Sequence, residues 1–97
     1  MPVSQAKVAT TAASRYLQQL CKHWSHKFEV AFTAEHGRVP FDGERVCMLE
    51  AHPDHLALRV EAQDDATLIR LEGVVIEHLK RFAFREDLGE VQWSRAG

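Results

Sequence analysis

Two groups of basic side chains have the residue types and spacing that anion binding requires. The first group falls near residues 22–27 and the second within residues 78–85. Together they are Lys22, His23, His26, Lys27, His78, Arg81 and Arg85. Members of the second group are three or four residues apart, so they line up on one side of a helix. Arginine binds carboxylate or phosphate through two parallel hydrogen bonds, and lysine and protonated histidine add charge.

If the helices that carry the two groups pack side by side, the groups meet. We therefore predict a surface, called the basic rim below, that binds an anionic small molecule or an acidic protein surface. A structural explanation competes with this one. Cations near a helix C-terminus oppose the negative end of the helix dipole, and solvated charges are ordinary on helix surfaces.

Histidine and cysteine spacings suggest metal or thiol chemistry as an alternative. His23 and His26 are three residues apart, so both rings can face one ion, with Cys21 beside them. A closed zinc site needs four ligands with firm spacing, and the sequence has no Cys-x-x-Cys pair. Cys21 and Cys47 each fall beside apolar positions, as small buried side chains do. We therefore expect no metal and no cofactor. If the protein does bind a metal, the candidate ligands are His23, His26 and Cys21.

Catalytic motifs are missing from the sequence. It has no glycine-rich phosphate loop, no nucleophile elbow and no paired-carboxylate motif. A thiol nucleophile needs a base within hydrogen-bond reach. Cys21 can provide the thiol, and a histidine from elsewhere in the chain can act as the base. We expect a binding module rather than an enzyme, with a small thiol or histidine enzyme as the alternative.

Composition sets the outer limits. The chain has 97 residues with 45% hydrophobic content, enough for one core, so we expect a single domain over residues 1–97. No apolar run approaches the roughly 20 residues that span a bilayer, so we expect no membrane partner. The two cysteines are too few for a disulfide framework, so we expect a cytoplasmic location. The formal charge of −2 argues against nucleic acid as a partner.

Two amphipathic helices are predicted. Residues 64–85 carry an apolar stripe, and acidic residues at 64 and 65 suit the first turn; the stripe is Leu68, Leu71, Val75, Leu79 and Phe82. Gly73 interrupts this helix and predicts a close approach of its backbone to the sheet. A shorter helix is predicted from Thr11 to about Trp24, with Thr10 as its N-cap.

The remaining apolar runs alternate as strands do. Strands are expected at 6–10, 28–33, 38–41, 44–51, 55–62 and 91–94, with turns at His36-Gly37, Asp42-Gly43 and Pro53-Asp54. Short turns force antiparallel pairing, because parallel strands need long crossovers. We therefore predict an α+β fold of two layers in the order β-α-β-β-β-β-α-β, an antiparallel meander sheet with both helices on one face.

Three blocks of sequence resemble a known family. The first block is residues 15–17 and 20–27, and the closing block is residues 78–79 and 81–86. The middle block is residues 37–39, then Cys47 with Leu49 and Ala51, and residues 71–72. These blocks are similar to a family of short bacterial proteins catalogued as a domain of unknown function. Similar domains occur beside or joined to siderophore-interacting flavin reductases. The resemblance therefore implies a role near ferric-siderophore handling, with such a reductase as a partner.

Three functional hypotheses remain open. The first is an accessory module that binds an anionic ligand or partner through the basic rim. The second is a metal-binding protein or small enzyme. The third is a self-association module, in which an edge strand carrying Val46 and Met48 pairs with a second copy.

Overall fold

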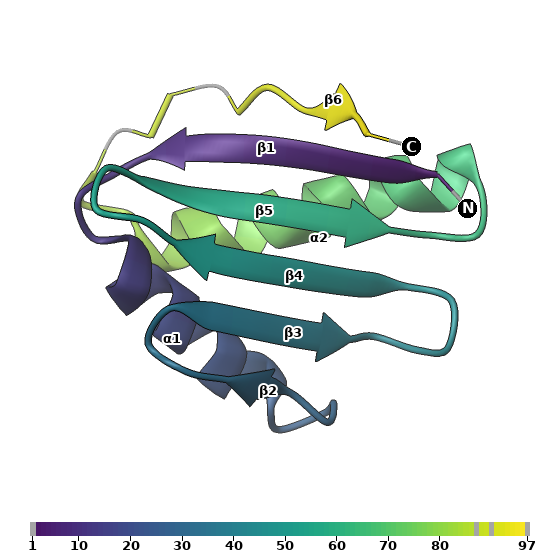
Figure 1. The fold of residues 1–97 in the computed structure, drawn as a ribbon, viewed down its shortest axis with the longest axis horizontal. Coiled ribbons are helices and arrows are strands. Elements are labelled where there is room, and N and C mark those ends of the chain that lie inside the picture. The colour runs from purple at the N-terminus through teal and green to yellow at the C-terminus, as the bar shows by residue number, and fades with distance from the viewer. Residues whose placement is uncertain (1, 87, 90, 97) are drawn as a thin grey trace.

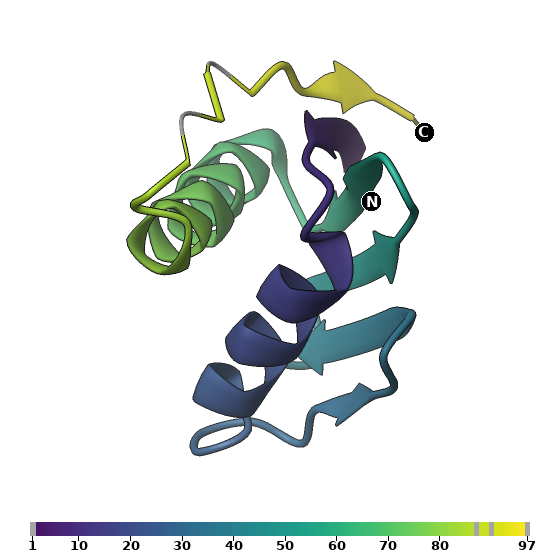
Figure 2. The ribbon, with the colours of Figure 1, turned by 90° about the vertical axis from the view of Figure 1, so that its left-hand side faces the viewer.

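The computed structural model describes residues 2–86, 88–89 and 91–96. Within them the chain forms one antiparallel sheet in the order β2-β3-β4-β5-β1-β6. Two helices cover one face of this sheet, and Figure 2 shows that the opposite face carries no helix. The elements are β1 (Val3–Ala9), α1 (Ala13–Trp24), β2 (Ala31–Phe32), β3 (His36–Pro40), β4 (Val46–Ala51), β5 (His55–Glu61), α2 (Asp65–Phe82) and β6 (Ser94–Arg95), as drawn in Figure 1. The predicted α+β fold and its order of elements are confirmed.

The longer helix, α2, begins where its capping residue predicts. The side chain of Asp64 accepts a hydrogen bond of 2.7 Å from the backbone N–H of Thr67, which satisfies one of the free donors of the first turn. Four residues of the apolar stripe are buried, namely Leu68, Leu71, Val75 and Leu79. Phe82, the last stripe residue, is only partly buried. The prediction that Gly73 meets the sheet is wrong, because nothing lies within 4 Å of a Cβ built there.

The shorter helix, α1, begins at Ala13 rather than Thr11. Ala12 occupies the N-cap position, and it provides no capping side chain. The hydroxyl of Thr10 accepts a hydrogen bond of 3.1 Å from the backbone N–H of Ala12. Thr10 therefore stabilises the turn before the helix and does not cap the helix. The buried face of α1 consists of Ala13, Tyr16, Leu17, Leu20, Cys21 and Trp24.

One predicted turn is wrong. His36 and Gly37 belong to β3, and the chain reverses just before them, where the N–H of Thr33 donates to the carbonyl of His36 at 2.7 Å. The Thr33 hydroxyl fixes this turn by accepting the backbone N–H groups of Glu35 and His36 at 3.2 and 3.1 Å. The predicted turns at 42–43 and 53–54 do connect β3 to β4 and β4 to β5.

The two edge strands of the sheet, β2 and β6, are shorter than predicted or shifted along the chain. Only Ala31 and Phe32 of the predicted strand 28–33 pair with β3. The last strand covers Ser94 and Arg95, which pair with β1, so Trp93 precedes it. Residue 90 lies outside the described residues.

The core fills the space between the helices and one face of the sheet. Alternate residues of each long strand point into it, including Val8 of β1, Leu49 of β4 and Leu58 of β5, each about 2% exposed. The residues between them point to the opposite, uncovered face. Neither helix of the described chain has the length and hydropathy that a bilayer crossing needs.

Candidate functional site

The uncovered face of the sheet carries a row of paired residues that cross four strands. In β3, Arg38 is opposite Met48 of β4, which is opposite Arg59 of β5, which is opposite Gln5 of β1. Two residues before Arg59 in β5, and on the same face, Ala57 is opposite Glu50 of β4 and Lys7 of β1. The pleat of the strands places these side chains on the face away from the helices.

This face holds a groove of about 1140 Å³. Lys7, Arg38 and Arg59 line it, together with Glu50 and His36, and Met48 and Ala57 contribute apolar surface. Among the described residues, none of the three cations forms a salt bridge. The groove therefore has an excess of positive charge, which no carboxylate of residues 2–86, 88–89 and 91–96 neutralises in a direct ion pair. We call Lys7, Arg38, Arg59 and Met48 the groove residues.

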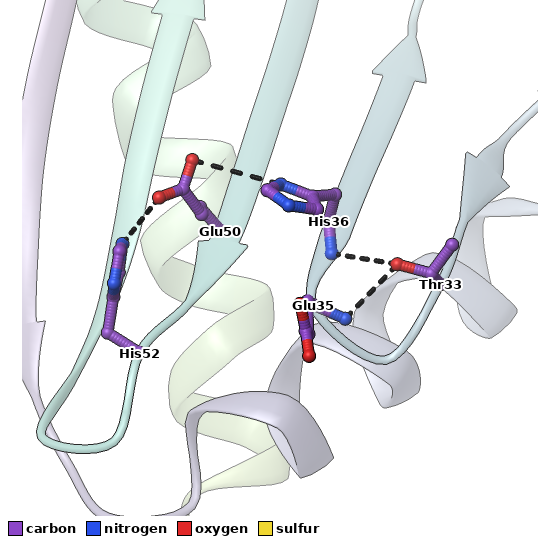
Figure 3. A network of polar contacts seen from close by, with 5 residues as sticks. All are labelled: Thr33, Glu35, His36, Glu50 and His52. Atoms are coloured by element: carbon purple, nitrogen blue, oxygen red, sulfur yellow. Dashed lines mark hydrogen bonds and ion pairs between the residues drawn. The ribbon is translucent and has the colours of Figure 1, made fainter.

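Among the described residues, Glu50 is the acidic residue that lines the groove, and histidines contact its carboxylate, as Figure 3 shows. Glu50 lies between two rings, 2.6 Å from Nε2 of His52 and 3.8 Å from Nδ1 of His36. The His52 ring stacks on that of His55 with centroids 4.3 Å apart, and His55 Nδ1 lies 2.7 Å from Oδ1 of Asp54. These contacts join the ends of β3, β4 and β5 and hold the Glu50 carboxylate at one side of the groove.

The two basic groups of the predicted rim meet in part. His23 of α1 and His78 of α2 have ring centroids 5.3 Å apart, and the centroids of His23 and Phe82 are 5.9 Å apart in an edge-to-face arrangement. Partial desolvation, and after it the positive charges of His78, His26, Arg81 and Lys27, hold the pKa of His23 below its usual range. The cations of both helices are therefore close enough to influence one another.

Other rim residues have contacts elsewhere or are exposed on the surface. Arg81 donates to Oε1 of Glu77 at 2.8 Å, one turn earlier on α2. The Arg85 guanidinium lies 5.4 Å from the ring centroid of Phe84, which is 74% exposed. Lys22 is exposed, and it belongs to no salt bridge within the described residues. Within the described residues, neither the groove on the open face of the sheet nor a second pocket beside Ser14 and His52 has a rim residue in its lining.

The cysteines do not lie with the histidines of the rim. Cys21 points toward Gly37 in the core, and burial raises the pKa of its thiol to about 11. Burial also raises the pKa of the Cys47 thiol far above its ordinary value. Both thiols are therefore protonated at neutral pH and make poor nucleophiles or metal ligands. Among the described residues, no three histidine, cysteine, aspartate or glutamate side chains are placed to hold a metal ion.

The groove residues were not predicted from the sequence. Their signal is the alternation within strands 6–10, 38–41, 44–51 and 55–62, whose outward positions carry Lys7, Arg38 and Arg59. Each cation alone is typical of a solvated strand face. Only the register of four strands shows that they surround one area.

Residues 5–94 match a family described as an uncharacterized protein conserved in bacteria (DUF2218). The chain belongs to this family. The NMR structure of PA4090 from Pseudomonas aeruginosa is similar to the chain, with 44% sequence identity. The match covers 97% of this chain and 96% of that one, with a TM-score of 0.81. No curated protein matches the chain significantly.

Proposed function

We propose that this DUF2218 domain is a binding module that holds a small organic anion in the groove on the open face of its sheet. One observation carries the proposal. Three cations from three strands, Lys7, Arg38 and Arg59, line a single groove without a salt bridge among the described residues. Folded proteins usually keep such cations beside carboxylates or spread over the surface, so a cluster around one groove favours an anion as ligand.

The size and lining of the groove favour a small molecule. Its volume of about 1140 Å³ is at or slightly above the roughly 300–1,000 Å³ of typical ligand sites. Met48, 36% exposed, supplies an apolar surface between the charged residues. Polar groups that fix orientation beside an apolar surface are the usual composition of ligand pockets.

Binding is tested with anilinonaphthalene sulfonate, a fluorescent aromatic anion, and by NMR titration of backbone amides. We expect saturable binding, with the largest amide shifts in β3, β4 and β5. An Arg38→Gln/Arg59→Gln double variant should lose at least about tenfold in affinity, because a hydrogen bond to a charged group contributes about 1.5–3 kcal/mol. Arg70→Gln is the matched control, since Arg70 is exposed on α2, on the other side of the sheet. Equal loss in the control variant, or shifts confined to the helices, would contradict the proposal.

The basic rim is a second candidate, favoured by the 5.3 Å contact between His23 and His78. We propose it as a docking surface for an acidic protein, with a siderophore-interacting flavin reductase as the first partner to test. Exposed Phe84 beside Arg85 supports docking, because aromatic and arginine side chains dominate protein interfaces.

The rim is tested by titrating a purified reductase of that class with the wild-type domain and with Arg81→Ala/Arg85→Ala. If the rim docks the reductase, binding disappears while stability changes by no more than about 0–1 kcal/mol per surface pair. Affinity should also rise as pH falls from about 7.5 to 6, because histidines gain charge in that range. Because the pKa of His23 is lowered, this residue gains its charge, and adds to the affinity, in the more acidic part of that pH range. Binding that survives the double substitution would remove the rim as the docking site.

A further inference from the structure

We infer that the groove takes a dianion with a flat apolar body, whose two anionic groups bridge Arg38 on one side and Arg59 with Lys7 on the other. This inference rests on the proposed function and adds the class of ligand. It follows from how the sheet spaces the groove residues.

The two arginines form opposite poles of the groove. They stand in one row of the ladder with Met48 of β4 between them. Neighbouring strands are about 4.8 Å apart, so the backbone positions of Arg38 and Arg59 are separated by about 10 Å. A single carboxylate can form bidentate hydrogen bonds with both guanidinium groups only if both arginine side chains bend inward over Met48. Two carboxylates joined by a short rigid body meet them with less rearrangement.

Lys7 strengthens one pole. Gln5 is directly opposite Arg59, and Lys7 follows two residues later on the same face of β1, which makes it a diagonal neighbour of Arg59. The pole at Arg59 therefore carries two positive charges, and the pole at Arg38 carries one.

The surface between the poles is apolar. Met48 occupies the centre of the row, and Ala57 of β5 is opposite Glu50 in the next row. A thioether makes favourable contacts with aromatic rings, and alanine leaves room above the sheet. A flat ring suits this surface better than a branched or polar body does.

Glu50 sets the direction of the ligand. It follows Met48 by two residues on the same face, and His36 and His52 hold its carboxylate at the side of the groove. Its negative charge repels an anion that extends along the strands toward it. An anion that lies across the strands, from Arg38 to Arg59, avoids this repulsion.

Three benzene carboxylates test the inference: benzoate, phthalate (1,2-dicarboxylate) and terephthalate (1,4-dicarboxylate). Phthalate and terephthalate have the same atoms and charge and differ only in the separation of their carboxylates. Affinities are measured by calorimetry at pH 7.5 and 0.15 M salt, where the Debye length of about 8 Å limits non-local charge effects. We expect terephthalate to bind at least about tenfold more tightly than either of the others.

Variants identify the contacts. Arg38→Gln and the double change Lys7→Gln/Arg59→Gln should each reduce terephthalate affinity to that of benzoate, because either change leaves one pole. Each should weaken benzoate far less than terephthalate. Met48→Ala should weaken terephthalate more than adipate, a flexible dianion without a ring. Arg70→Gln should leave every affinity unchanged, and thermal unfolding of each variant checks that it is folded.

The possible failures can be told apart. Equal affinities for phthalate and terephthalate, or dependence on one arginine alone, would overturn the bridging dianion and leave the groove as an anion site. Absence of binding by all three carboxylates and by the fluorescent anion would overturn the proposed function as well. Binding that persists in Arg38→Gln/Arg59→Gln and disappears in Arg81→Gln would transfer the site to the basic rim and overturn both.

Discussion

At the scale of single residues, Gly37 of β3 packs closely against Cys21 of α1. A Cβ built on Gly37 would lie 2.7 Å from the Cys21 sulfur, and 3.5 Å from side-chain atoms of Leu17 and Leu49. The last two distances are ordinary contacts, so the sulfur alone excludes a side chain at position 37. The glycine therefore lets α1 approach the sheet and is not there to form a turn.

Gly37→Ala should destabilise the domain by about 1–3 kcal/mol through overpacking. Urea unfolding of Gly37→Ala, Cys21→Ala and the double variant measures this effect. In the double variant the alanine methyl occupies space that the sulfur has left, so the two substitutions should cost less together than their sum. Additive costs would show that Cys21 is not the group that excludes the methyl.

At the scale of the element, α2 has one buried face and one free face, and the two respond oppositely to substitution. On the free face, Gly73 is exposed and its surroundings are open. Gly73→Ala should therefore stabilise the domain by about 0.5–1 kcal/mol, because alanine loses less backbone entropy in a helix. A rise in the urea midpoint at constant slope checks this. A fall would mean that the position has a packing role.

On the buried face, Leu79 is fully inaccessible and lies near the end of the stripe. Leu79→Ala should reduce the free energy of unfolding by about 2–5 kcal/mol, through lost burial and the cavity that remains. Ile69→Ala is the matched control, since Ile69 is 60% exposed on the same helix. It should change the free energy of unfolding little, and similar losses in the two variants would contradict this assignment of faces.

At the scale of the whole molecule, a hydrogen bond ties α1 to the segment that follows α2. The Tyr16 hydroxyl, on a buried side chain, donates to the Glu86 carboxylate. This bond, and after it one from Thr10, lowers the pKa of Glu86, and the same carboxylate raises the pKa of Tyr16.

Because the folded state depresses the pKa of Glu86, its contribution to stability is present above the unfolded value of about 4.3. The contribution is lost as pH falls through the lower folded value. Tyr16→Phe should therefore destabilise the domain near pH 7, and its deficit relative to wild type should shrink as pH falls below about 4.3. Urea midpoints measured from pH 7 to 3 test this. A deficit independent of pH would assign the effect to packing of the ring alone.

The sequence predicted most of the fold because apolar periodicity and turn chemistry act locally. The stripe from Leu68 to Leu79, the Asp64 cap and the alternation in residues 55–62 each report burial directly. The turn predicted at His36-Gly37 was wrong, because glycine serves close packing as well as positive φ. Only the position of Cys21 in space distinguishes the two uses.

The candidate sites were predictable to different degrees. Helical spacing gave the alignment of His78 with Arg81, and packing of α1 beside α2 brought His23 to them. The groove depends on Arg38 and Arg59 facing the same way from different strands, which requires the register of β3, β4 and β5. Register is a long-range property, so no local spacing in the sequence reveals it.

The position of β1 inside the sheet has a consequence for the order in which the molecule forms. On the ribosome β1 is made first, yet it lies between β5 and β6, whose first residues are His55 and Ser94. The hairpins from β3 to β5 can pair as soon as they emerge, because their turns are short. The nascent β1 and α1 must wait, with Val8 and Leu17 uncovered, until β5 offers an edge. Closing the sheet is then a non-local step across about half of the chain, the kind of step that slows folding.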